Sequence, residues 1–120
     1  MILVDANLLI HAWNTDSPDH QAAKAWLDGR LNAVEGVAMP WPSLLAFVRI
    51  VTNPRIFSRP ASPAAAWNQV RDWLECDNVF NPEPTERHFT LLSGVVGRAD
   101  RANLVPDAHL AALAIEYGLI

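Results

Sequence analysis

The first ten residues constrain the fold more than any other stretch of the chain. Residues 1–4 are apolar, and Asp5 follows them directly. A short run rich in Ile, Leu and Val predicts a strand that is buried on both faces. Asp5 falls where this strand ends, and ligands of open α/β sheets bind beyond the carboxyl ends of the strands. We expect a helix over residues 7–13 to follow.

Asp5 has two interpretations, and its local sequence does not separate them. Asp is a favoured N-cap residue, so it can simply begin the following helix. A buried carboxylate is otherwise costly unless it is paired or binds a metal ion. A second acid, Asp107, follows Pro106 and opens another predicted helix, whose N-terminal dipole stabilises a carboxylate. If the two carboxylates meet, a cation such as Mg²⁺ or Mn²⁺ would offset their repulsion and hold a substrate phosphate.

Strand and helix patterns alternate along the chain. Further strands are expected at 36–39 and 78–80, with a strand also starting at Leu119. Ser17–Pro18 and Ser62–Pro63 both have the form of an N-cap followed by Pro at the first helical position. Helices are expected at 18–32, 42–52, from Ser62 to about 75, from Thr85 onward and at 107–117, with a polar loop at 97–103 and a stop at Gly118. This order predicts a three-layer α/β/α sandwich around a short parallel sheet.

The length of 120 residues indicates a single domain. With a net charge of −4 and a pI of about 5.4, the chain shows no broad basic field for nucleic acid. All the basic residues except Lys24 are arginines, however, and three lie close together at Arg49, Arg55 and Arg59. Arginine suits bidentate contacts to phosphate. Ordinary surface charge is an equally simple interpretation of this group.

The single cysteine, Cys76, excludes an internal disulfide and a cysteine-based zinc set. The N-terminus lacks the basic region and cleavage site of a secretory leader, and no apolar run is long enough to span a bilayer. We therefore expect a cytoplasmic protein.

Four segments, in order, resemble motifs of the PIN-domain ribonucleases, and in particular the VapC toxins of bacterial type II toxin–antitoxin modules. These segments are residues 2–10, 42–49, 52–57 and 105–114. The resemblance implies a PIN-like fold and a Mg²⁺-dependent endoribonuclease that cleaves RNA phosphodiester bonds by metal-activated water, with Mn²⁺ as a possible substitute. It also implies a homodimer and a small cognate antitoxin that covers the site and forms a larger hetero-oligomer.

The resemblance assigns roles to individual residues. Asp5 and Asp107 would be the metal ligands. Asn7 would orient Asp5 or a water by hydrogen bonding, or alternatively cap the next helix. Arg49 would contact RNA phosphate or an antitoxin carboxylate, unless it forms a structural ion pair. Ser43 would touch the site or, more simply, cap its helix.

Two departures from the family pattern concern catalysis. Many PIN domains carry a Glu in the third helix, and Phe47 occupies that position here. The family also has a further strand and acidic motif after the last helix, and we expect residues 1–120 to lack them. A catalytically impaired PIN-like binding module is therefore the alternative function. A haloacid-dehalogenase-like phosphatase ranks last, because that class places a second Asp where this chain has Asn7.

Other side chains are weaker candidates. His88 and His109 could act as general bases, but a lone histidine is usually structural. The tryptophans are interpreted as core or dimer contacts rather than as platforms for base stacking.

Overall fold

The structure is a computed structural model that describes residues 1–96 and 105–119, so the expected loop at 97–103 lies outside the described residues. The elements follow in the order β1 (Ile2–Leu3), α1 (Ala6–Trp13), α2 (His20–Leu31), β2 (Val37–Ala38), α3 (Trp41–Val51), α4 (Pro63–Leu74), β3 (Val79–Phe80), α5 (His88–Val96) and α6 (Val105–Tyr117).

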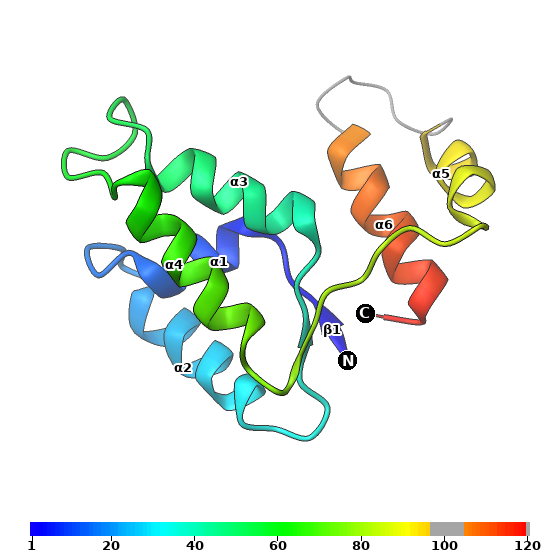
Figure 1. The fold of residues 1–120 in the computed structure, drawn as a ribbon, viewed down its shortest axis with the longest axis horizontal. Coiled ribbons are helices and arrows are strands. Elements are labelled where there is room, and N and C mark those ends of the chain that lie inside the picture. The colour runs from blue at the N-terminus through cyan, green and yellow to red at the C-terminus, as the bar shows by residue number, and fades with distance from the viewer. Residues whose placement is uncertain (97–104, 120) are drawn as a thin grey trace.

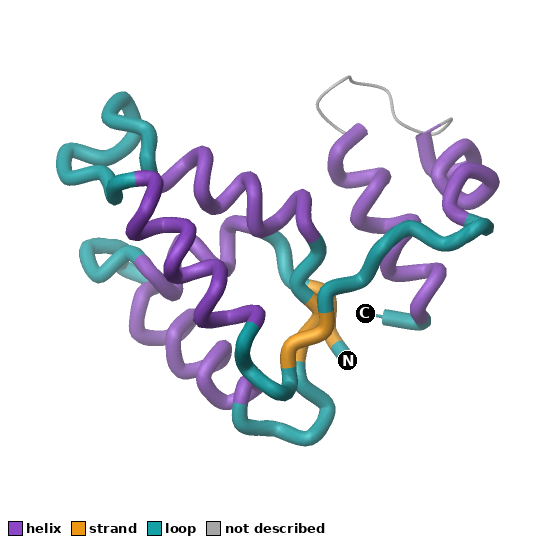
Figure 2. The backbone as a smooth tube through the Cα atoms, in the orientation of Figure 1, coloured by secondary structure: helices purple, strands orange, loops and turns teal. Residues whose placement is uncertain are grey.

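The three strands form one parallel sheet with β2 in the centre. Ile2 pairs with Val37, and Val37 pairs with Val79. Helices α1 to α4 gather on one side of the strands, and α5 and α6 lie on the other (Figures 1 and 2). The expected three-layer α/β/α arrangement with a short parallel sheet is therefore confirmed.

The main core lies among α1, α3, α4 and the sheet, and Phe47 is at its centre. This side chain is 0% exposed, and its ring lies 4.9 Å from Trp73 and 6.1 Å from Trp13, both edge to face. The central strand is equally enclosed, because Val37 and Ala38 are fully buried. The apolar run 36–39 therefore forms a strand that is covered on both faces.

The cap prediction is confirmed for α4 and wrong for α2. Ser62 caps α4 by accepting a hydrogen bond from the amide of Ala65 at 3.1 Å. Helix α2 begins only at His20, because the hydroxyl of Ser17 contacts Nδ1 of His11 at 2.7 Å and accepts from the amide of Asp19. The Ser17 hydroxyl, which the local sequence pattern predicts as the N-cap of α2, is thus bonded to the ring of His11.

The start of α5 and the backbone after α6 also differ from expectation. Helix α5 begins at His88 rather than Thr85, because the Thr85 hydroxyl accepts from the amide of Arg87 in a turn. Gly118 ends α6 as expected, with a φ of 65° that favours glycine. Leu119 then donates from its amide to the carbonyl of Ala114 in place of a strand pairing, and Ile120 is outside the described residues. Among the described residues, no helix is long and apolar enough to cross a membrane.

Candidate active site

A pocket of about 150 Å³ lies at the carboxyl ends of β1 and β2, where three helices begin. It contains both acids that the sequence singled out, although one is near each end of the chain. Its lining comes from the starts of α1, α3 and α6: Asp5, Ala6, Asn7, Pro42, Ser43, Ala46, Pro106, Asp107 and Leu110.

Asp5 caps α1 and lines the pocket, so its two interpretations are compatible. Its Oδ1 accepts hydrogen bonds from the amides of Asn7 at 2.9 Å and Leu8 at 3.3 Å. These contacts satisfy two of the amides that a helix start leaves unpaired. The carboxylate is exposed and its orientation is fixed by its own helix.

The pocket contains two carboxylates, and carboxylate oxygens suit a hard cation. Helix N-termini normally attract anions through their unpaired N–H groups. Here Asp5 already accepts from the first amides of α1, and Pro42 and Pro106 have no N–H. Oxygen ligands are those that Mg²⁺ prefers, so Asp5 and Asp107 are the residues that would hold it.

The structure shows which of the weaker candidates from the sequence, Asn7, Ser43 and Arg49, line the pocket. Asn7 lines the pocket, and the residue that caps α1 is Asp5 rather than Asn7. Capping by Ser43 is wrong: α3 is capped at Pro40, and Ser43, which is only 2% exposed, donates its hydroxyl to the carbonyl of Val4 at 2.8 Å. This bond ties the start of α3 to the end of β1. Arg49 is exposed one turn beyond the pocket and does not line it.

No third acid reaches the pocket from α3. Phe47, at the position where the family pattern places Glu, turns into the core, and Ala46 is the residue of that turn that faces the pocket. Among residues 1–96 and 105–119, no group of three or more His, Cys, Asp or Glu side chains is placed to share a metal ion. The described site therefore offers two carboxylates.

Both histidine candidates belong to a hydrogen-bonded chain between α5 and α6. His88 Nδ1 lies 2.5 Å from Oε2 of Glu116, and His88 Nε2 lies 3.0 Å from His109 Nδ1. Thr85 donates to the other Glu116 oxygen from its amide at 2.8 Å and from its hydroxyl. Since a carboxylate only accepts, His88 carries its proton on Nδ1. The histidines are thus engaged structurally, as lone histidines usually are.

Sequence reasoning missed Glu116, although one signal was available. His109 and Glu116 are seven residues apart, which places them on one face of a helix. Burial raises the pKa of Glu116, but the hydrogen bonds from Thr85 and His88 outweigh it, so its pKa lies below the ordinary value. Burial, and then the charge of His88, lower the pKa of His109, against a smaller opposing effect of Glu116.

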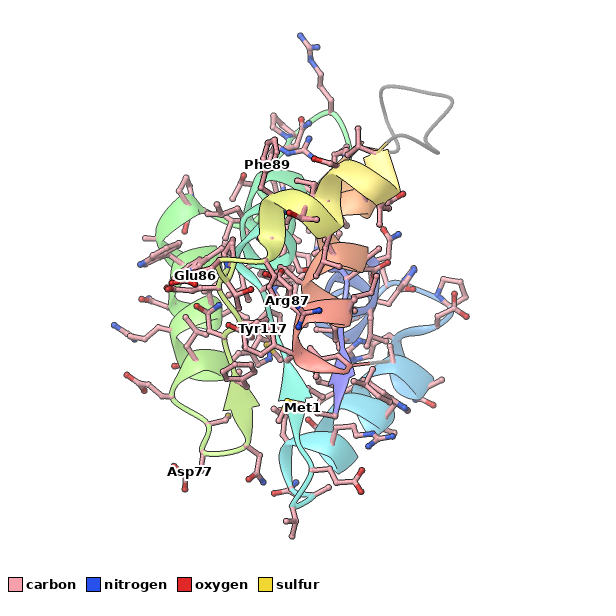
Figure 3. The ribbon with its side chains drawn as sticks, turned by 90° about the vertical axis from the view of Figure 1, so that its right-hand side faces the viewer. Met1, Asp77, Glu86, Arg87, Phe89 and Tyr117 are labelled. Atoms are coloured by element: carbon pink, nitrogen blue, oxygen red, sulfur yellow. The ribbon has the colours of Figure 1, made fainter. Side chains whose placement is uncertain are left out.

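The C-terminal part of α6 is attached to the segment between β3 and α5. The hydroxyl of Tyr117 donates to the carbonyl of Glu83 at 2.7 Å, and its ring packs edge to face on Phe80 at 5.2 Å. Figure 3 shows Tyr117 at this end of α6, with Phe89 on α5 above it. These contacts hold the helix whose first turn carries Asp107.

Comparisons with known proteins agree with this arrangement. The family model described as PIN domain matches residues 2–120. Ribonuclease VapC37 of Mycobacterium tuberculosis is 45% identical over 118 residues, which cover 98% of this chain and 82% of that protein. Ribonucleases VapC33 and VapC43 of the same organism are 36% and 35% identical, over 98% and 97% of this chain and 82% and 80% of their own lengths.

Proposed function

This chain belongs to the PIN-domain family, within its VapC group, and we propose that it is a metal-dependent endoribonuclease and the toxic component of a type II toxin–antitoxin system. One observation carries the proposal: Asp5 and Asp107, from opposite ends of the chain, line the same pocket. The relatives named ribonucleases support the choice of RNA as substrate. Residues 1–120 would act as one PIN-like domain in the cytoplasm.

The cofactor that we propose is Mg²⁺, with Mn²⁺ as a substitute. When bound, it would neutralise charge on the phosphodiester and activate water for attack on phosphorus. Asp5 and Asp107 would hold it, because they are the two carboxylates of the pocket. The amides of Asn7 and Leu8 keep the Asp5 carboxylate oriented, so little reorganisation is needed on binding.

Polar neighbours of the two acids would position the substrate. The carboxamide of Asn7, at the pocket wall, would hydrogen-bond Asp5 or a water. The hydroxyl of Ser43 donates a hydrogen bond to the carbonyl of Val4, but its oxygen can still accept a hydrogen bond from a ribose hydroxyl. Arg49, one turn further along α3, would contact a phosphate beside the scissile one.

The first experiment measures cleavage of total cellular RNA with added Mg²⁺ or Mn²⁺ by protein that is free of antitoxin. Asp5→Asn and Asp107→Asn should each lower the rate on the order of 100-fold or more, because each removes a ligand of the metal ion that would act on the reacting phosphate. Asp72→Asn, an exposed acid on α4, is the matched control. If all three variants match the parent, with no metal-dependent product, the enzyme proposal is wrong.

The proposed partners are the RNA substrate, a second copy of the chain and a small antitoxin. A pocket with two carboxylates would accept an arginine from such a partner in place of the metal, through charge-assisted hydrogen bonds. Native mass spectrometry of the complex purified from its own cells should show an even number of these chains with a smaller protein. A lone monomer would contradict the proposed assembly.

The second candidate is a PIN-like binding module with impaired catalysis. Its support is the Ala46 side of the pocket, where α3 supplies no carboxylate. Calorimetry with Mn²⁺ separates the two functions. A binding module would show no heat of binding that depends on Asp5 and Asp107, whereas the nuclease would.

A further inference from the structure

We call the pocket that contains Asp5 and Asp107 the acidic pocket. A second pocket, of about 270 Å³, lies beyond the far ends of α1 and α3, two of the helices that begin at the acidic pocket. It is bounded by residues 13–16, which are the last residue of α1 and the three that follow it, and by residues 57–59, in the loop after α3. Figure 1 shows these two loops side by side at the end of the molecule opposite α5 and α6. We call it the loop pocket.

The loop pocket and the acidic pocket lie along one stripe of α1. Ala6 lines the acidic pocket and Trp13 lines the loop pocket, and positions seven apart share a helix face. Asn14, the residue that follows α1, also lines the loop pocket. The eight residues of α1 span about 12 Å. At about 3.4 Å per phosphate of a stacked strand, this length corresponds to three or four phosphates.

The wall of the loop pocket combines aromatic rings with a cation. Trp13 packs edge to face on Phe57, with 5.7 Å between ring centroids, and on Phe47 of the core at 6.1 Å. The rings are therefore held in place and only partly covered. Arg59 lines the same pocket, and its guanidinium has no carboxylate within 4.0 Å among the described residues. Arg49 and Arg55, between it and the acidic pocket along the chain, are likewise exposed and unpaired with any described carboxylate.

These features suit a nucleotide better than an acidic peptide. Single-stranded RNA is recognised by stacking on aromatic side chains and by hydrogen bonds to base edges, while arginines contact its backbone. Asp16 also lines the pocket, with its backbone held by Asn14. Its carboxylate would repel the acids of a peptide, but it can accept a hydrogen bond from the amino group of a base.

We propose that the loop pocket binds a nucleotide of single-stranded RNA whose scissile phosphate lies in the acidic pocket, with Arg59 on the backbone and Phe57 and Trp13 against the base. This inference rests on the proposed ribonuclease function. The inference adds the direction of the bound RNA to that function, since the RNA would run along α1 and α3, away from α5 and α6.

The test is equilibrium binding of a fluorescent ten-nucleotide RNA of mixed sequence, without divalent metal, so that no cleavage is needed. Arg59→Gln should weaken affinity several-fold and lower the slope of log affinity against log salt by about 0.7, because one phosphate contact is lost. Phe57→Leu, which keeps apolar volume, should weaken affinity with the slope unchanged. Arg71→Gln, an exposed arginine of α4, should change neither.

Two further measurements locate the site. A three-nucleotide RNA spans about 7 Å at the same phosphate spacing, so it can occupy the loop pocket without reaching the acidic pocket, and its affinity should still respond to Arg59→Gln. Ten-nucleotide RNA with 5-iodouracil should cross-link on illumination to the peptides that carry residues 13–16 or 57–59. Cross-links confined to other peptides, or an Arg59→Gln variant that matches Arg71→Gln, would overturn the proposal.

The outcomes also separate this site from the proposed function. RNA binding at the loop pocket without metal-dependent cleavage supports the pocket and contradicts the nuclease. Metal-dependent cleavage that is insensitive to Arg59→Gln supports the nuclease and contradicts RNA binding at the loop pocket. If Arg59→Gln instead lowers recovery of a co-expressed small partner and leaves RNA affinity unchanged, the pocket is a protein contact and the proposal is wrong.

Discussion

At the scale of single residues, the acidic pocket depends on where neighbouring side chains of one helix turn point. Phe47 faces the core at 0% exposure, while the adjacent Ala46 faces the pocket. A family pattern that aligns Phe47 with an acid therefore does not tell which position can supply one in this chain. Ala46 is the position on α3 from which a carboxylate would join Asp5 and Asp107.

Ala46→Glu should strengthen Mn²⁺ binding by roughly tenfold, because a third carboxylate adds charge and a ligand to the site. Titration calorimetry measures the change. Leu45→Glu is the matched control, since Leu45 is 53% exposed on the same helix and does not line the pocket. Equal affinities in the two variants would contradict the assignment of Asp5 and Asp107 as metal ligands.

At the scale of elements, the position of β2 depends on the turn before it. Gly36 has a φ of 64°, and a Cβ at this position would meet the carbonyl oxygen of Asn78 at 2.0 Å. The next amide, that of Val37, donates to this same carbonyl at 3.0 Å. Glycine thus lets the backbone come close enough for β2 to pair with β3.

Gly36→Ala should destabilise the protein by at least about 2 kcal/mol, because it combines a clash with a conformation unfavourable to L residues. Gly29→Ala is the control. Gly29 lies inside α2, and a Cβ added there would have no atom within 4 Å, so alanine should stabilise by about 0.5–1 kcal/mol. Urea unfolding of both variants gives the two free energies, and equal signs would show that the turn is not strained.

At the scale of the whole molecule, α5 and α6 form a unit that the segment after β3 holds against the rest. Their mutual contacts include the polar chain of Thr85, Glu116, His88 and His109. The side chain of Glu116 has no solvent-exposed surface, so the carboxylate at the centre of this chain is shielded from water, while Thr85 is exposed. The position of Asp107 at the other end of α6 depends on these contacts.

Replacing Glu116 should therefore have an effect that depends on pH. The pKa of Glu116 is lowered in the folded protein, so its ionised form stabilises the fold above the unfolded pKa of about 4.3, and this contribution is lost as pH falls through the folded pKa. Glu116→Gln should be less stable than the parent at pH 7, and the difference should shrink below about pH 4.3.

Thermal unfolding of the parent and the variant between pH 3 and pH 7 measures this difference. Glu86→Gln is the control, since Glu86 is an exposed residue of the same region (Figure 3). A gap between Glu116→Gln and the parent that stays constant with pH would mean that the carboxylate is not stabilised by its hydrogen bonds.

The order of elements and the two acids could be predicted because local chemistry carries them. The apolar run before Asp5 forms strand β1, although Ile2 and Leu3 are only partly buried rather than covered on both faces, Ser62–Pro63 starts a helix, and Gly118 ends one. Because ligands of open α/β sheets bind beyond the carboxyl ends of the strands, Asp5 could then be placed at the ligand-binding edge of the sheet. These signals depend on residues that are close in sequence, so no tertiary contact was needed to interpret them.

Only the tertiary structure decided which polar groups find one another across the fold. Ser17 bonds to His11 instead of capping α2, Ser43 bonds to Val4 instead of capping α3, and Glu116 finds His88 on another helix. A hydroxyl or carboxylate near a helix end has several possible partners of similar free energy. Long-range packing selects among them, because only the folded chain shows which partner is within hydrogen-bonding distance and shielded from water.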